Sequence, residues 1–158
     1  MSWQDDKVYF KRAYEVSVEA FKQGNDPFGA VLVDGEGNII IEQMNECGSG
    51  DQTAHDAIRA ISKASAKYEQ SYMWECTLYA TIQPCCMCVG AAYWANLGKI
   101  KYVMSEKELG EILGGGGLDL PSEDVIARGD KKIVVSGPYD PLRPAVKDLI
   151  LEWKKSWG

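Results

Sequence analysis

The sequence predicts an α/β fold in which helices cover both faces of one five-stranded mixed sheet, giving a three-layer α/β/α sandwich. Short apolar, β-branched runs alternate along the chain with longer segments whose apolar residues recur at helical spacing. The first two runs flank a glycine-rich turn, whereas later runs are separated by helical segments. Because 158 residues suit one domain better than two, we expect a single domain over residues 1–158.

The first elements are a helix and a hairpin. An amphipathic helix is expected from Asp5 to Lys22, because its apolar residues recur near every 3.6 positions. The turn-forming residues 24–27 end it. Strands at 28–33 and 39–41 follow, joined by the glycine-containing turn at 34–38.

The later elements alternate between helix and strand. Thr53 can cap a helix that runs to about Lys67. Gly114 to Gly117 is read as a flexible loop. The remaining elements are strands at 77–82, 100–104 and 132–135, a helix that opens after Pro84, and a final helix from about Leu142 to Lys155.

Composition favours a cytoplasmic protein that acts on a small, neutral molecule. The formal net charge is -6 without an extended basic cluster, which argues against nucleic acid as a partner. No apolar run is long enough to span a membrane, and the first residues do not resemble a signal peptide. Five cysteines, an odd number, do not suggest a disulfide framework.

Three residues have the types and spacing of a zinc site. Cys85 and Cys88 stand three positions apart at a predicted helix start, and His55, the single histidine, stands near another. Catalytic zinc commonly takes three such ligands and keeps one position open. Buried structural cysteines with a core histidine are the alternative. We predict that these three residues bind Zn2+.

The motifs around these residues resemble those of the cytidine and purine deaminase superfamily, most closely bacterial guanine deaminases and related nucleoside deaminases. The resemblance implies a cytidine-deaminase-like sandwich, one zinc per subunit, hydrolytic removal of an exocyclic amine, and a homodimer. The matching segments are Pro27-Phe28-Gly29-Ala30-Val31, Asn45, Asp51-x-Thr53-Ala54-His55, Pro84-Cys85-x-Met87-Cys88 and Tyr93-Trp94-Ala95.

The chain departs from the superfamily signature at one position. The signature is His-x-Glu followed by Pro-Cys-x-x-Cys, and its glutamate transfers the protons. Ala57 occupies the glutamate position here. Asp56 is one residue away, about 100° around a helix, so we expect it to be solvent-facing or capping. A natural pseudoenzyme and an engineered Glu→Ala form both remain open.

The resemblance also suggests substrate-binding residues. Asn45 corresponds to a position that hydrogen-bonds substrate, although asparagine is also common in turns. Asp119 follows the glycine run and is a candidate substrate contact or proton shuttle, or a solvated loop acid. Phe28 and Trp94 are candidate aromatic walls, or core residues. Trp157 is a candidate to reach a partner subunit's site, or to pack on its own domain.

The sequence therefore favours deamination of an amino-purine base or nucleoside, with guanine or a related base first, by a chain that binds substrate but is catalytically impaired. A non-catalytic protein that binds zinc and a nucleobase is the alternative from another class. Cytosine or cytidine, a pterin, a triazine and a tRNA adenosine remain alternative substrates.

Overall fold

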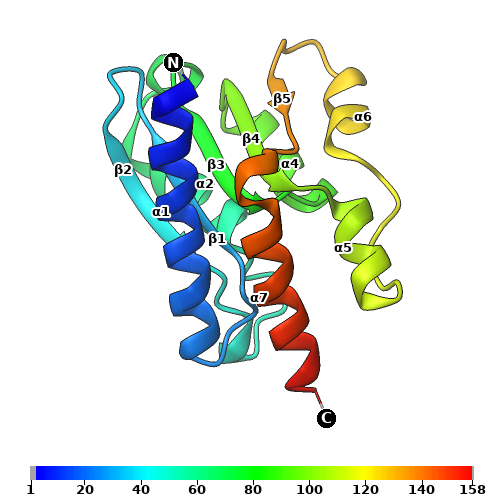
Figure 1. Cartoon of the computed structure of the whole chain (residues 1–158). Coiled ribbons are helices and arrows are strands. Elements are labelled where there is room, and N and C mark those ends of the chain that lie inside the picture. Colours follow the sequence, from blue (N-terminus) through cyan, green and yellow to red (C-terminus); the bar gives the residue numbers. More distant parts are fainter. Residues whose placement is uncertain (1–2, 158) are drawn as a thin grey trace.

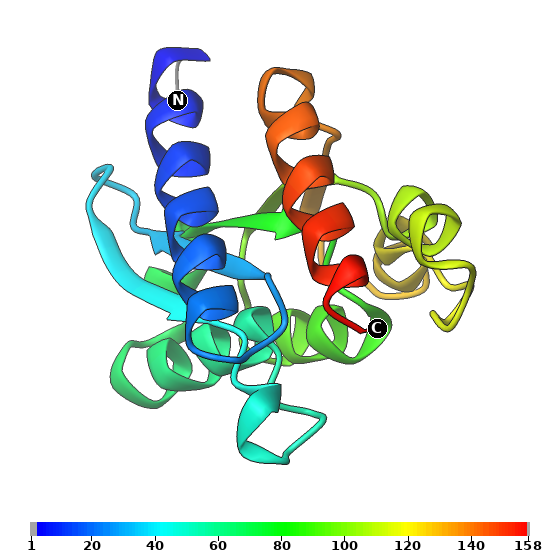
Figure 2. The same cartoon turned by 60° about the horizontal axis from the view of Figure 1, so that its bottom comes forward.

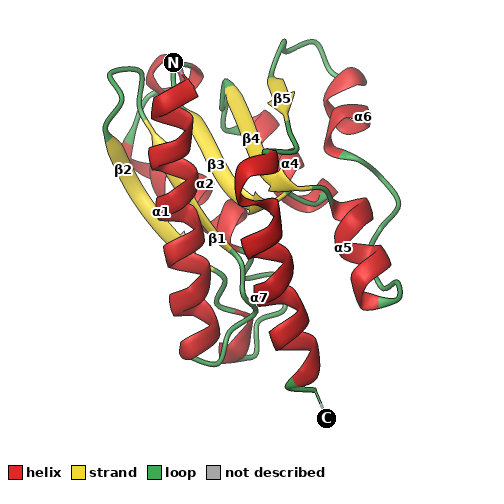
Figure 3. Ribbon diagram, in the orientation of Figure 1, coloured by secondary structure: helices red, strands yellow, loops and turns green. Residues whose placement is uncertain are grey.

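The computed structural model describes residues 3–157 and has the predicted architecture, a mixed sheet between two layers of helices (Figures 1 and 3). The strands lie in the order β2-β1-β3-β4-β5. β1 pairs antiparallel with β2 and β3, whereas β3, β4 and β5 run parallel. Their bounds are β1 Gly29–Val33, β2 Ile39–Met44, β3 Thr77–Ile82, β4 Lys99–Met104 and β5 Val134–Ser136.

Each face of the sheet has its own apolar core. Along β1, Ala30 and Leu32 belong to one buried cluster and Val31 and Val33 to the other, as strand alternation requires. Figure 2 shows α1 and α7 on one side of the sheet, with α2 and α4 on the opposite side. The bounds of these four helices are α1 Trp3–Lys22, α2 Asp56–Lys67, α4 Cys86–Trp94 and α7 Arg143–Lys155.

Gly29 allows β1 to begin in close contact with α1. A Cβ at this position would lie 2.6 Å from the backbone nitrogen of Ser17 and 2.7 Å from the carbonyl oxygen of Ala13. Only glycine fits such an approach. The contact fixes the start of the strand and therefore the position of the preceding residue, Phe28.

Several short helices were not located from the sequence: α3 (Gln70–Trp74), α5 (Glu106–Leu113), α6 (Ser122–Ala127), and the 3-10 turns η1 (Cys47–Ser49) and η2 (Asp140–Leu142). The α5 helix has a sequence signal, since Ser105 and Glu108 have capping-box spacing and the Ser105 hydroxyl accepts the Glu108 N–H at 3.1 Å. Gly114 ends α5 with a φ of 83°. The glycine run therefore begins as a helix C-cap.

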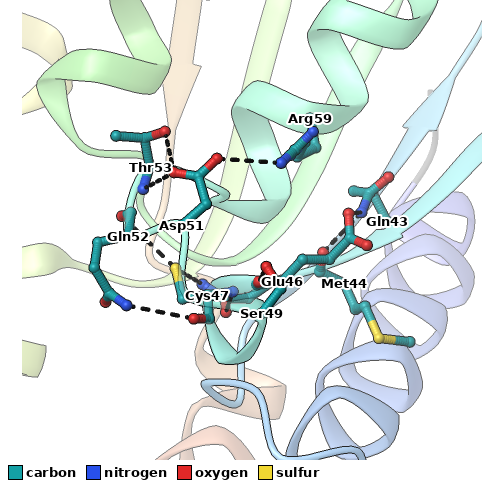
Figure 4. Close-up of polar contacts among 10 residues, drawn as sticks. Gln43, Met44, Glu46, Cys47, Ser49, Asp51, Gln52, Thr53 and Arg59 are labelled. Atoms are coloured by element: carbon teal, nitrogen blue, oxygen red, sulfur yellow. Dashed lines mark hydrogen bonds and ion pairs between the residues drawn. The ribbon is translucent and has the colours of Figure 1, made fainter.

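The expected capping role of Thr53 is wrong. The α2 helix begins at Asp56, with His55 at its N-cap position. The N–H and hydroxyl of Thr53 instead donate to one carboxylate oxygen of Asp51, at 2.9 and 2.7 Å, while Arg59 contacts the other at 3.3 Å (Figure 4). Asp51 therefore competes for the Thr53 hydroxyl, and the N-cap position lies two residues later, at His55.

Among residues 3–157, no helix combines the length and the apolar character needed to cross a membrane.

Candidate metal centre

The three predicted ligands come together at the starts of two helices. His55 precedes α2, Cys85 precedes α4, and Cys88 lies in the first turn of α4. The His55 Nδ1 atom lies 3.5 Å from the Cys85 Sγ atom and 3.7 Å from the Cys88 Sγ atom, and the two sulfurs are 3.8 Å apart. Helix starts present backbone N–H groups, which favour thiolate over thiol.

These separations fit one zinc ion. Tetrahedral bonds of about 2.3 Å to sulfur and about 2.0 Å to nitrogen place two sulfurs about 3.8 Å apart, and a sulfur and a nitrogen about 3.6 Å apart. In the described part of the chain, these three side chains are the group whose ligand atoms lie close enough together to hold one metal ion. When bound, zinc polarises a substrate and activates water.

The ligands also influence one another's protonation. The hydrogen bond from the Cys88 thiol lowers the pKa of Cys85 to about 4, against the opposing effect of burial, and His55 lowers it further. The same contact raises the pKa of Cys88, and the hydrogen bond to Cys85 raises that of His55. The pair therefore holds one negative charge readily, and the second thiol needs a cation to ionise.

A cavity of about 140 Å³ lies against the ligands. Its walls combine the apolar side chains of Phe28, Ile82 and Leu109 with the acids Asp56 and Glu106. A second hollow of about 180 Å³ adjoins it and shares Gln83, Glu106, Gly110 and Gly117. The site is therefore small, mainly apolar, and lined by acids close to the ligands.

Ala57 is buried and lines this cavity together with the three ligands. Asp56 is not solvent-facing either: it is 8% exposed and lines the same cavity. Burial raises the pKa of Asp56 to about 6, although its carboxylate accepts backbone N–H groups of Asp56 and Ala57. The capping alternative therefore agrees with these contacts, and the solvent-facing one was wrong because the helix start is covered.

An aromatic row leads away from the cavity. Phe28, which lines the cavity, contacts Trp153 edge-on with ring centroids 5.5 Å apart. Trp153 in turn contacts Trp157 edge-on at 4.8 Å, and Trp157 is 54% exposed. Among the described residues, Trp157 thus contacts its own chain at Trp153, which lies between it and Phe28.

The structure places Trp94 away from the site, which corrects its assignment as an aromatic wall. It is 78% exposed and lines a separate surface hollow with Ile58 and Ala91. Trp94 follows Cys88 by six residues, which is about 9 Å along a helix axis and a rotation of about 240°. A residue at that position faces a different side of α4 from the ligands.

Asn45 is buried and is held in a turn. Its side-chain oxygen accepts the N–H of Cys47 at 2.9 Å, and its amide lies 3.3 Å from the sulfur of that residue. Asn45 is not among the described residues that line the cavity. Asp119 lines the adjoining hollow and is exposed. The geometry thus brings Phe28 and Ala57 to the cavity of the ligands, leaves Asp119 in the adjoining hollow, and holds Asn45 in a turn outside the cavity.

Sequence reasoning missed two polar residues of the cavity, Gln83 and Glu106. Gln83 follows β3 and Glu106 follows β4, two neighbouring parallel strands. Binding sites of α/β proteins gather outside the carboxyl ends of such strands. That rule could have identified both residues once the strands had been predicted.

Comparison with known proteins assigns the family. Residues 3–104 match the family model described as the cytidine and deoxycytidylate deaminase zinc-binding region. The chain belongs to this family. Membership confirms the predicted resemblance and Zn2+ as the cofactor, and the family's activity is hydrolytic deamination.

Several deaminases are related at the level of sequence. A probable cytosine deaminase of Schizosaccharomyces pombe is 31% identical over 86% of this chain and 85% of its own. The guanine deaminase of Bacillus subtilis is 37% identical over 66% of this chain and 68% of its own. A tRNA-specific adenosine deaminase of Haemophilus influenzae is 33% identical over 68% and 62%.

The same fold occurs in a solved guanine deaminase from Nitrosomonas europaea. It superposes with a TM-score of 0.75 and 25% identity, covering 93% of this chain and 83% of the other. The predicted cytidine-deaminase-like sandwich is therefore confirmed.

Proposed function

We propose that this chain holds Zn2+ through His55, Cys85 and Cys88 and binds a small planar amino-heterocycle beside it. The preferred ligand in this proposal is an amino-purine base or nucleoside. We further propose that its deaminase activity is impaired, because Ala57 replaces the glutamate that moves protons in this family. The observation that carries the proposal is the cavity in which the three ligands, Phe28 and Ala57 meet.

The volume of the cavity and the side chains around it support a small substrate. The cavity of about 140 Å³ is well below the roughly 300–1,000 Å³ of sites for drug-sized ligands. Phe28 offers an aromatic wall, and Asp119 could approach a ligand from the adjoining hollow. The guanine deaminases among the relatives support a purine.

Restoring the missing group tests the proposal directly. We expect Ala57→Glu to increase ammonia release by about two to four powers of ten on the correct substrate, as general acid–base catalysis usually contributes. The panel should contain guanine, guanosine, cytosine, cytidine, a pterin and an aminotriazine. Alanine at position 57 should leave ground-state binding largely intact, because the missing group acts mainly in the transition state.

A non-catalytic nucleobase-binding protein is the second candidate, favoured by the same alanine. Zinc loading and ligand binding without turnover in Ala57→Glu would support it. Neither binding nor turnover across the panel would contradict both candidates. A tRNA substrate is disfavoured by the net charge of -6, although tRNA deaminases are among the relatives.

We also propose a cytoplasmic homodimer of single-domain subunits. The exposed Trp94 and its neighbours Ile58 and Ala91 form an apolar hollow on the outer side of α2 and α4, which supports self-association. Light scattering should give twice the mass of the chain, and a monomeric mass at micromolar concentration would contradict this.

A further inference from the structure

The cavity beside the metal ligands and the adjoining hollow share a wall. Four residues line both of them: Gln83, Glu106, Gly110 and Gly117. The volume of the cavity is about 140 Å³ and that of the hollow about 180 Å³. Each volume alone is below the roughly 300 Å³ at which sites for drug-sized ligands begin, whereas the two together reach it. The pair therefore has room for a ligand with two parts.

The shared wall lacks side chains at two positions. A Cβ atom at Gly110 or at Gly117 would meet no heavy atom of a more distant residue within 4 Å. Neither glycine has a positive φ, so the backbone does not require glycine at either position. Gly110 lies inside helix α5, where glycine costs about 1 kcal/mol relative to alanine. Neither packing nor backbone conformation therefore accounts for Gly110, whereas the open space that it leaves between the cavity and the hollow does.

The cavity and the hollow differ in chemistry. The apolar side chains of Phe28, Ile82 and Leu109 form part of the cavity wall and suit the faces of a flat ring. The hollow includes the exposed side chains of Lys107 and Asp119, which donate and accept hydrogen bonds respectively. A sugar presents hydroxyl groups that both donate and accept. The cavity therefore matches the heterocycle of a nucleoside, and the hollow matches its sugar.

The hollow does not suit a phosphate group. Phosphate sites are commonly built from arginine forks or from several cations. Among the described residues that line the hollow, Lys107 is the one cation, and the acid Asp119 lies in the same wall. The formal net charge of the chain is -6, which adds to the repulsion of a phosphate. A nucleoside therefore fits the site better than its monophosphate.

We propose that the chain binds its amino-heterocycle as a nucleoside, with the heterocycle in the cavity and the sugar in the adjoining hollow, and that Gly110 keeps the passage between them open. This inference rests on the proposed function and chooses between its two forms of substrate, base and nucleoside. A free base occupies the cavity alone and makes no contact in the hollow. Gly110 is then a specificity-determining residue, because a larger side chain at this position excludes the sugar and leaves room for the base.

The first test compares ligands by calorimetry on the zinc-loaded chain with Ala57 in place. Guanine and cytosine are each measured beside their nucleoside and the corresponding monophosphate. For the heterocycle that the chain prefers, the nucleoside should bind at least about tenfold more tightly than the free base, as one or two added hydrogen bonds contribute. The monophosphate should bind no more tightly than the nucleoside.

The second test fills the passage. Gly110→Leu places a side chain between the cavity and the hollow, at a helix position that accepts leucine. It should weaken nucleoside binding at least about tenfold, the usual effect of overfilling a packed space, and leave binding of the free base unchanged. Glu111→Leu adds the same side chain to the same helix outside both spaces, so it is the matched control and should bind like the parent. Zinc content should equal one per chain in all three.

A variant outside α5 gives the same information if the leucine variant does not fold. Asp119→Ala removes an acceptor for the sugar hydroxyls, so it should weaken binding of the nucleoside and not of the base. Asp124→Ala, at an exposed acid that lines neither the cavity nor the hollow, is its control.

The outcomes separate this inference from the proposed function. A free base that binds as tightly as its nucleoside, or a monophosphate that binds more tightly, overturns the inference alone. So does Gly110→Leu, or Asp119→Ala in its place, if nucleoside binding is unchanged or falls equally with that of the base. A parent that retains zinc but binds neither bases nor nucleosides overturns the proposed function as well.

Discussion

At the scale of single residues, Cys88 is the metal ligand most enclosed by protein. It is 1% exposed, whereas Cys85 and His55 are only partly buried. We expect Cys88→Ser to lose most of its zinc, because a serine hydroxyl stays protonated at neutral pH and cannot replace the thiolate ligand. The neighbouring Cys86→Ser, outside the ligand group, should keep the parent's zinc content. Metal analysis of the purified variants checks this, and full zinc in Cys88→Ser would contradict the ligand set.

The ligands could be predicted from the sequence, whereas the acids around them could not. Histidine and cysteine are rare here and their spacing is specific, so their types alone indicated a metal. Asp56 and Glu106 are common residues whose meaning depends on burial. Burial raises the pKa of Glu106 to about 8, and the charge on Cys85 adds to this effect. Neither influence can be derived from residue order, because both depend on the loops that close the cavity.

At the scale of elements, Asp34 organises the turn between β1 and β2. One carboxylate oxygen accepts the N–H of Glu36 at 3.0 Å and that of Asn38 at 2.9 Å. The other accepts the hydroxyl of Tyr72, from α3, at 2.9 Å. Burial would raise the pKa of Asp34, but the hydrogen bonds, that of the Asn38 N–H foremost, outweigh it and lower the pKa.

Removal of this carboxylate should therefore destabilise the fold in a pH-dependent way. We expect Asp34→Ala to reduce the free energy of unfolding by about 1–3 kcal/mol at pH 7. Since the folded pKa lies below the ordinary 3.8, the stabilisation is complete above that value and is lost as pH falls through the folded pKa. Urea unfolding at pH 7 and pH 3 checks this, with the exposed Glu36→Ala on the same turn as the control. A difference that grew at pH 3 would contradict the argument.

The long elements followed from the sequence because their periodicity extends over many residues. The helix now bounded by Trp3 and Lys22 and the strand at 77–82 agree closely with expectation. The helices α3 and α6 could not be predicted in this way, because five or six residues are too few to show a helical period. The start of α6 supplies the contacts of Gln83 with Ser122 and Glu123, and α5 with the loop after it lines the second hollow. Part of the fold that the sequence did not locate therefore also forms part of the site.

At the scale of the whole molecule, the metal joins two helices that approach it from separate segments of the chain. His55 belongs to the start of α2, and both cysteines to the start of α4, with about thirty residues of chain between them. Binding to the folded state alone stabilises that state. A chelator should therefore lower the midpoint of thermal unfolding by several degrees, and added zinc should restore it. An unchanged midpoint in metal-free protein would show that the site does not support the fold.

The row of T-shaped contacts that joins Phe28, Trp153 and Trp157 gives the molecule an optical reporter of its own cavity. A heterocycle that packs on Phe28 changes the environment of the ring beside Trp153, so its arrival should alter indole emission without any attached dye. The chain has five tryptophans, and Trp153→Phe should remove the ligand-dependent part of the signal while Trp74→Phe, on α3, leaves it. A titration followed by fluorescence checks this, and an equal response in both variants would place the reporter elsewhere. If the prediction holds, Trp153 on the last helix reports whether a ligand occupies the cavity, although no residue of that helix lines the cavity.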